Sequence, residues 1–132
     1  MITSDEKAFL INEAISNNSN AYAPYSNYNV SATIMTINGK MFCGCNFESA
    51  SFGAGVCAER VALGAALSAG EREFKAICVC GNQDTITPCG ICRQALIEFG
   101  DIDVICCDIN GNSKEYKLKD LLPEAFSSSE FD

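Results

Sequence analysis

Two cysteines, Cys89 and Cys92, stand three residues apart in the stretch TPCGIC, directly after a proline. The chain contains no histidine, so thiolates are its natural ligands for a soft divalent metal. A C-x-x-C pair of this kind serves as a dithiol redox pair, as half of a structural zinc clip, or as part of a catalytic metal site. The pair alone leaves all three interpretations open.

A third cysteine, Cys57, opens the stretch CAERVALG, with Glu59 and Arg60 close behind it. Catalytic zinc sites commonly take three ligands from the protein and leave the fourth position for water. A carboxylate that is not a ligand can accept a proton from that water and pass it to a substrate nitrogen. Three thiolates leave the metal site negatively charged, so a cation beside the sulfurs is needed, and Arg60 is the first candidate, with Arg93 the second.

Both cysteine motifs are expected to open helices. CAERVALGAALSAG (57–70) ends at a glycine, and PCGICRQALIEFG (88–100) has a proline before it and a glycine behind it. A helix N-terminus favours thiolates. Since Glu59 lies roughly 200° around an ideal helix from Cys57, the two share one site only at the mouth of the helix.

The remaining pattern predicts an α/β protein. The other expected elements are a helix over 3–18 with a Thr3–Glu6 capping box, a hairpin over 28–48 turning at Asn38-Gly39, buried strands over 74–81 and 102–109, an edge strand over 114–120 after Asn110-Gly111, and a last helical turn within 118–126. An antiparallel hairpin followed by β-α-β-α-β units predicts a three-layer α-β-α fold with a mixed sheet of about five strands. We expect one domain over 1–132.

Composition excludes several classes of function. The net charge is −8, with nine Lys and Arg against seventeen Asp and Glu, which argues against binding of nucleic acid. The sequence contains no stretch of about 18 apolar residues, so we expect no membrane span. The N-terminal segment lacks the pattern of a signal peptide. Nine cysteines without an export signal indicate reduced thiols and a cytoplasmic protein.

The stretch CAE followed about thirty residues later by PCGIC resembles the three-cysteine form of the zinc nucleoside deaminase signature. AYAPYSNYNV, GCNFESASFG, PCGICRQ and LLPEAF extend the resemblance to the small homotetrameric cytidine deaminases over nearly the whole chain. It implies one zinc ion per subunit on Cys57, Cys89 and Cys92, with Glu59 as proton shuttle. The implied reaction is hydrolysis of cytidine and deoxycytidine to uridine, deoxyuridine and ammonia, for pyrimidine salvage.

The resemblance also implies substrate contacts. Asn46 and Glu48 match residues that bind the ribose hydroxyls, and the Ala58 carbonyl would accept a hydrogen bond from the 4-amino group. Tyr28 stands close to the nucleoside, where the family usually has phenylalanine. Phe126 matches an aromatic residue that reaches into a neighbouring subunit and stacks on the base, which implies a homotetramer with shared active sites.

Alternatives remain at this point. A deaminase of a modified cytosine nucleoside, of the blasticidin type, shares the zinc motif, although Arg60 and the LLPEAF ending favour the cytidine enzyme. A non-catalytic zinc module would need a fourth ligand from among Cys43, Cys45, Cys78, Cys80, Cys106 and Cys107. We expect these six to pack as small apolar residues. The sequence departs from the family pattern at two further places. Ser49 replaces an amide residue in the segment expected to bind the sugar, and the strand sequence VSATI alters the expected packing beneath the site.

Overall fold

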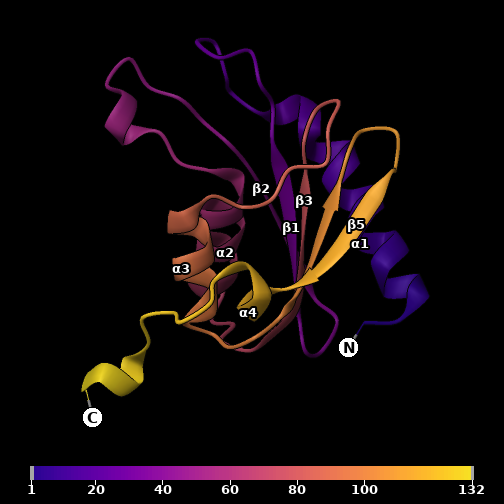
Figure 1. Cartoon of the computed structure of the whole chain (residues 1–132). Coiled ribbons are helices and arrows are strands. Elements are labelled where there is room, and N and C mark those ends of the chain that lie inside the picture. Colours follow the sequence, from indigo (N-terminus) through magenta and orange to yellow (C-terminus); the bar gives the residue numbers. More distant parts are fainter. Residues whose placement is uncertain (1, 132) are drawn as a thin grey trace.

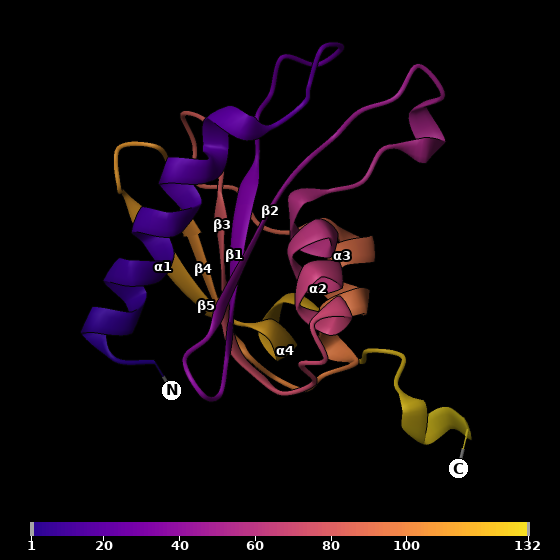
Figure 2. The ribbon, with the colours of Figure 1, turned by 180° about the vertical axis from the view of Figure 1, so that it is seen from behind.

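The computed structural model describes residues 2–131 and has three layers. A five-stranded sheet forms the middle layer. Helix α1 (Ser4–Asn17) covers one face, while α2 (Ala58–Ser68), α3 (Gly90–Ile97) and the short α4 (Leu118–Leu121) lie on the other (Figures 1 and 2). The predicted three-layer α-β-α architecture is confirmed.

The sheet is mixed, as predicted. Its strands are β1 (Ser31–Thr36), β2 (Met41–Cys45), β3 (Phe74–Cys80), β4 (Asp103–Cys107) and β5 (Ser113–Lys117). They lie in the order β2-β1-β3-β4-β5, with β3 and β4 parallel and the other neighbours antiparallel. The last strand of the chain, β5, is an edge strand. Both predicted Asn-Gly turns connect antiparallel neighbours, one between β1 and β2 and one between β4 and β5.

The central strands separate two apolar cores. Alternate residues of β4 contribute to each: Val104 and Cys106 belong to the core under α2 and α3, and Ile105 and Cys107 to the core under α1. Because both faces are covered, these strands are apolar almost throughout. Of the six cysteines outside the predicted metal site, the four in β3 and β4 are buried in the cores, as expected of packing residues, and Cys43 and Cys45 in β2 are half-buried.

Strand β1 is buried along its whole length, including the polar residues that alternate with its apolar ones. Helix α1 covers the face on which Ser31 lies, and the Ser31 side chain finds its partners on α1 and in the turn that follows it. The Ser31 hydroxyl donates to the carbonyl of Ala14 and accepts from the Asn18 amide. The serine of VSATI therefore faces α1 rather than the helix that carries the predicted catalytic residues.

Helix ends follow the sequence signals. The Thr3 hydroxyl accepts from the backbone N–H of Glu6 while the Glu6 carboxylate accepts from the Thr3 N–H, which is the predicted capping box. Gly70 and Gly100 follow α2 and α3 with φ of 93° and 103°, a left-handed conformation that favours glycine. Both helices therefore stop where the sequence indicated.

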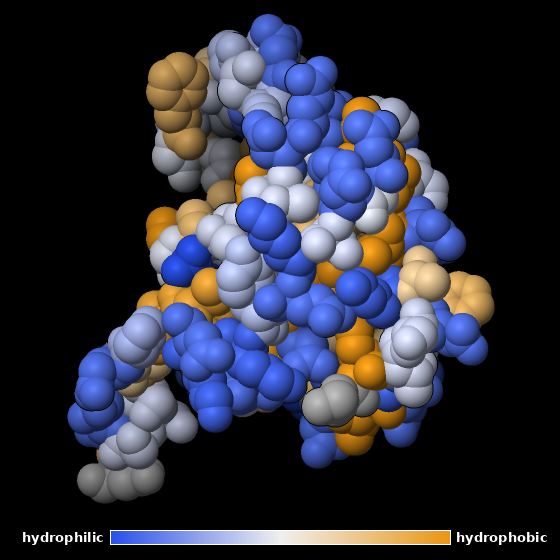
Figure 3. Space-filling view, turned by 45° about the vertical axis from the view of Figure 1, so that its right-hand side comes forward, coloured by the Kyte–Doolittle hydropathy of each residue, from blue (hydrophilic) through white to orange (hydrophobic). Residues whose placement is uncertain are grey.

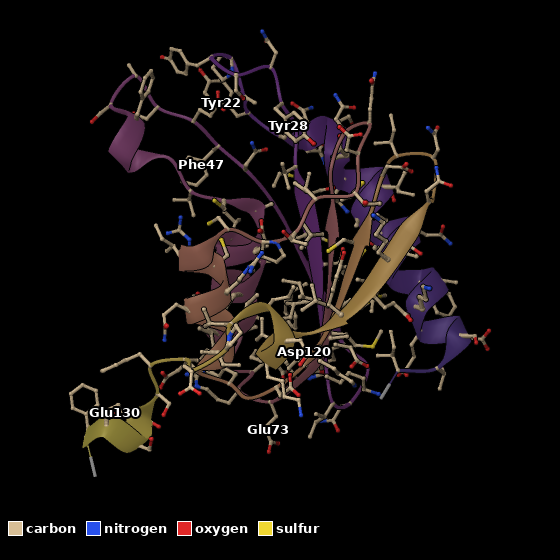
Figure 4. The ribbon with its side chains drawn as sticks, in the orientation of Figure 1. Tyr22, Tyr28, Phe47, Glu73, Asp120 and Glu130 are labelled. Carbon is tan, nitrogen blue, oxygen red and sulfur yellow. The ribbon has the colours of Figure 1, made fainter. Side chains whose placement is uncertain are left out.

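Two loops project from one end of the molecule (Figure 1). They cover residues 21–30 and 46–56. An isolated bridge between Tyr22 and Phe47 joins them, and a second one between Phe47 and Val56 closes the base of the loop 46–56. The second loop leads directly into α2. In Figure 4, Tyr22, Tyr28 and Phe47 mark this end, and Glu73 marks the opposite one. Three 3₁₀ turns, Asn18–Asn20, Phe52–Ala54 and Ser128–Phe131, complete the described elements.

The view in Figure 3 shows hydrophilic side chains over most of one side of the molecule, with hydrophobic ones between them. Within residues 2–131, the longest apolar helical segments fall short of what a bilayer crossing requires.

Candidate active site and metal centre

Three cysteine sulfurs converge at the N-termini of α2 and α3. The Cys57 sulfur lies 3.8 Å from that of Cys89, and the Cys89 sulfur lies 3.6 Å from that of Cys92. All three lie within 4.8 Å of one another. Zn–S bonds of about 2.3 Å at tetrahedral angles place sulfurs about 3.8 Å apart, so the group has the spacing of a zinc site.

The fourth corner of this group is not filled by another ligand side chain. Over residues 2–131, no further cysteine, aspartate or glutamate comes close enough to all three sulfurs to join them. Three protein ligands with one position left over is the arrangement of a catalytic zinc site, whereas a structural site is closed by a fourth ligand. Within the described residues, the alternative of a structural zinc site therefore lacks its fourth protein ligand.

The backbone at the two helix entries explains how the cysteines meet. Cys57 and Cys89 are both N-cap residues in extended conformation, with ψ of 150° and 169°, and Cys92 lies one turn inside α3. Because Cys57 precedes the helix, its side chain does not follow the helical angle. The 200° offset from Glu59 therefore does not separate them, and both lie at the helix mouth as the shared site requires.

Gly44 of β2 allows helix α2 to pack closely against the sheet. A Cβ atom added to Gly44 would lie 2.3 Å from the backbone nitrogen of Ala62 and 2.8 Å from the carbonyl oxygen of Ala58. Only glycine permits this close approach of strand and helix. The position of Cys57, Ala58 and Glu59 thus depends on a residue that the sequence analysis did not single out, although an isolated glycine within a strand pattern signals such a contact.

Burial and neighbouring groups set the thiol pKa values in opposite directions. Burial raises the pKa of Cys57, and burial followed by the nearby Glu59 carboxylate raises that of Cys92. At Cys89 burial acts in the same sense, but the amide of Cys92 and the other two thiols outweigh it and hold the pKa below its ordinary value. Metal binding must therefore displace protons from Cys57 and Cys92.

Glu59 is buried beside the thiols, with 4% of its surface exposed. Burial raises the pKa of its carboxyl, against the opposing effects of its own backbone amide, Cys92 and Arg60. A carboxyl group whose pKa moves toward neutrality is suited to both accepting and donating a proton. Glu59 does not belong to the three-sulfur group, so it is placed as a neighbour rather than as a ligand.

Arg60 lies beside the thiols. Its guanidinium faces Cys92 and Cys57, and their sulfurs raise the pKa of Arg60. Its Nε atom is buried and has no hydrogen-bond partner in the structure. An unpaired buried donor beside three thiols is what a site built for thiolates would show, since sulfur anions accept hydrogen bonds that neutral thiols accept poorly. The residues present therefore fit a bound Zn²⁺ ion.

Arg93, the second candidate cation, has a different role. Its guanidinium donates to the carbonyls of Pro88 and Leu121 and to the Thr87 hydroxyl, at 2.7, 2.6 and 2.9 Å. It therefore fastens the loop that leads into Cys89 to the end of α4.

The two predicted sugar-binding residues are engaged with the neighbouring loop. Asn46 accepts from the backbone N–H of Val30 and donates to the carbonyl of Tyr28, each at 3.0 Å. Glu48 accepts from the N–H groups of Tyr25 and Ser26 at 2.9 and 3.1 Å and from the Ser26 hydroxyl. Sequence reasoning did not foresee these bonds, which fix the loop 21–30 beside the loop 46–56.

A pocket of about 360 Å³ lies between these loops. Its lining comprises Tyr25, Ser26, Glu48, Ser49, Phe52 and Gly55. Tyr28 is half-buried, and its hydroxyl comes close to the start of the loop that leads from β3 to Cys89. Ala58 is fully buried between Cys57 and Glu59. Phe126, on the C-terminal segment, has 58% of its surface exposed.

Comparison with known proteins identifies the family. Residues 4–108 match the cytidine and deoxycytidylate deaminase zinc-binding region. The chain belongs to the cytidine and deoxycytidylate deaminase family. A cytidine deaminase of Halalkalibacterium halodurans is 38% identical over 128 residues, which cover 95% of this chain and 97% of that protein. A probable cytidine deaminase of Dictyostelium discoideum is 40% identical over 83% of this chain and 76% of its own length.

Solved structures of this deaminase family share the fold. The crystal structure of cytidine deaminase from Burkholderia pseudomallei matches with a TM-score of 0.87 and 45% identity, over 95% of this chain and 100% of that one. The structure from Mycobacterium leprae matches with a TM-score of 0.77 and 30% identity, over 89% of this chain and 97% of that one.

Proposed function

We propose that the protein is a zinc-dependent cytidine deaminase that hydrolyses cytidine and deoxycytidine to uridine and deoxyuridine, releasing ammonia, in pyrimidine salvage. The observation that carries this proposal is the arrangement of three thiols at zinc spacing, with one corner open and buried Glu59 beside it. Family membership and relatives named cytidine deaminase support the choice of substrate.

Cys57, Cys89 and Cys92 hold the metal, and Arg60 offsets the charge of their thiolates. When bound, Zn²⁺ lowers the pKa of water toward neutrality and so supplies a nucleophile at neutral pH. Glu59 carries the protons of the reaction.

Glu59 accepts a proton from the attacking water and delivers it to the ring nitrogen. It then takes the remaining proton from the hydroxyl group added to the ring carbon and transfers it to the departing amine, as the carbon–nitrogen bond breaks. Oxygen from water thereby replaces nitrogen on the ring carbon, and ammonia leaves. The raised pKa of the Glu59 carboxyl suits both directions of transfer. The carbonyl of Ala58, next to Glu59 at the start of α2, accepts a hydrogen bond from the amino group that leaves.

Asn46 and Glu48 bind the ribose hydroxyls in this proposal, with Tyr28 beside the nucleoside. A carboxylate offers about four lone-pair positions, and the contacts of Glu48 with Tyr25 and Ser26 use three. One position is therefore available for a sugar hydroxyl. The same bonds orient the carboxylate before substrate arrives, which reduces the ordering that binding requires.

A homotetramer with shared active sites accounts for apolar residues that the single chain leaves exposed. They include Tyr22, Tyr25, Phe47, Phe52, Ile91, Phe126 and Phe131. An apolar groove of about 710 Å³ between α2 and α3, lined in part by Leu63, Leu67 and Phe99, adds to this surface. Phe126 contributes to a neighbouring subunit's site by stacking on the base.

The free state of all nine cysteines, which lie within residues 2–131, suits a reducing compartment. On this ground we place the enzyme in the cytoplasm, with residues 1–132 acting as one domain.

An ultraviolet assay tests the proposal. Purified protein should convert cytidine and deoxycytidine, lose that activity with a zinc chelator, and recover it with Zn²⁺. Conversion of a modified cytosine nucleoside but of neither natural nucleoside would assign the blasticidin-type activity instead. No conversion of any of these by zinc-loaded protein would reject an enzymatic role.

A further inference from the structure

Helix α3 holds the C-terminal segment as well as two of the three thiols. Its residue Gln94 donates from Nε2 to the carbonyl oxygen of Phe126 at 2.8 Å. Its neighbour Arg93 donates to the carbonyl of Leu121 at 2.6 Å. The two adjacent side chains therefore contact both ends of residues 121–126, and we call this pair the α3 clamp.

The clamp also reaches the metal loop. Arg93 Nε donates to the carbonyl of Pro88 at 2.7 Å, and Nη2 donates to the Thr87 hydroxyl at 2.9 Å. Pro88 is buried and directly precedes the thiol of Cys89. Two nitrogens of one guanidinium thus hold the residues that position a metal ligand. The third, Nη1, holds the segment that carries Phe126. A planar guanidinium makes three such bonds at once, which a lysine ammonium does not reproduce in this geometry.

The C-terminal segment needs such fastening because of its own conformation. Glu124 has φ of 56°, the left-handed region that disfavours a residue with a Cβ atom. This residue lies between the two clamped carbonyls, so the contacts at Leu121 and Phe126 hold a bend that the segment would not favour alone. The Phe126 ring meets Phe131 edge to face at 5.8 Å and is exposed in the single chain.

We infer that Arg93 and Gln94 are positioning residues that couple the metal loop of one subunit to the presentation of its Phe126 to the neighbouring active site. This inference rests on the proposed function. Gln94 fixes the carbonyl of the residue that stacks on the base, so it governs substrate affinity. Arg93 contacts both the loop that leads into Cys89 and the C-terminal segment, so it governs both substrate affinity and the retention of zinc.

The test compares Gln94→Ala, Gln94→Glu, Arg93→Ala and Arg93→Lys, with Asn12→Ala on α1 as a matched control. Gln94→Ala should raise KM for cytidine about fivefold, the equivalent of one neutral hydrogen bond, with kcat and zinc content unchanged. Gln94→Glu keeps the size but loses the donor, so it should raise KM at least as much. Both should increase hydrogen exchange at residues 122–131.

Arg93→Ala should raise KM and also speed the loss of zinc to a chelator, and Arg93→Lys should restore neither fully. Zinc loss and hydrogen exchange are measured without substrate, so they test the clamp even if cytidine is not turned over. Unchanged exchange at 122–131 in both alanine variants would overturn the inference. So would Arg93→Ala with wild-type zinc retention, because the coupling would then be absent.

Discussion

At the residue scale, the account depends on Glu59 as a proton carrier that does not bind the metal. Glu59→Gln keeps the size of the side chain and removes its ability to accept a proton. We expect kcat for cytidine to fall by about 10²–10⁴-fold or more, the usual contribution of a general acid–base group, while zinc content stays at one ion per chain.

The control is Glu73→Gln, an exposed carboxylate at the end of the molecule opposite the two loops (Figure 4). It should retain full activity. If Glu59→Gln lost zinc instead of turnover, Glu59 would be a metal ligand and the proton-transfer role would be wrong.

Glu48 offers a pH dependence whose sign follows from its contacts. The Ser26 hydroxyl, then the backbone N–H groups of Ser26 and Tyr25, hold the pKa of the Glu48 carboxyl below its ordinary value of 4.5. The ionised form therefore keeps the loop 21–30 in place at neutral pH, and the contact weakens only as pH falls through the lowered pKa.

Hydrogen exchange at residues 21–28, corrected for intrinsic rates, should be constant from neutrality down to about pH 4.5 and rise below it. Glu48→Gln should show faster exchange already at neutral pH, because an amide is a weaker acceptor for the two backbone N–H groups. A rise that begins well above pH 4.5 in the wild-type protein would mean that another group holds this loop.

How much of the site the sequence predicted depends on the kind of residue. Cys57, Cys89 and Cys92 were predictable because a metal requires particular atoms at short spacings near helix ends. The bonds that Asn46 and Glu48 make to residues 25–30 were not, since they depend on how two long loops lie against each other. The role of Arg93 was missed for the same reason: its partners Pro88 and Leu121 lie far apart in the sequence.

At the scale of elements, the position of α2 is set by its contact with β2. Gly44→Ala places a Cβ atom where it would meet the backbone of Ala62 and Ala58. Overpacking against backbone is expected to cost about 1–3 kcal/mol in the free energy of unfolding. The shift of α2 also moves Cys57, so zinc should be held less tightly.

Gly64→Ala is the matched control, since a Cβ at Gly64 in the same helix meets nothing within 4 Å. It should be neutral or stabilise the protein by about 0.5–1 kcal/mol, through helix propensity alone. Calorimetry and zinc analysis measure both effects. Equal stabilities of the two variants would show that α2 does not depend on the close approach at Gly44.

Helix and strand positions were largely predictable because turns, caps and apolar runs are local signals. The partner of Ser31 on β1 was not, because the carbonyl of Ala14 on α1 reaches this side chain only in the tertiary structure. The requirement that Cys57 and Glu59 meet at the helix mouth was predictable from their spacing, but the extended N-cap conformation that sets the direction of Cys57 was not.

At the scale of the whole molecule, we expect catalysis to require contact between subunits through Phe126. Phe126→Ala should raise KM for cytidine by about tenfold, within the range of base–aromatic stacking, with little change in zinc content. Phe9→Ala removes another exposed phenyl ring, from α1 in the opposite layer, and should leave KM unchanged.

Mixed assemblies of Glu59→Gln and Phe126→Ala chains separate a contact between subunits from one within a subunit. If the ring acts on a neighbour, chains with intact Glu59 regain the missing ring from their partners, and a fraction of sites should show wild-type KM. A KM that stays high in every mixture would place the action of Phe126 within its own chain.

The coordination of zinc in the loaded enzyme decides whether the three cysteines leave an open position for water. X-ray absorption at the zinc edge should show three sulfur neighbours at about 2.3 Å and one oxygen or nitrogen at about 2.0 Å. Three sulfurs and one light atom would establish an open corner beside Glu59. Four sulfur neighbours would contradict the account, because the metal would then be a closed structural ion with no place for the reacting water.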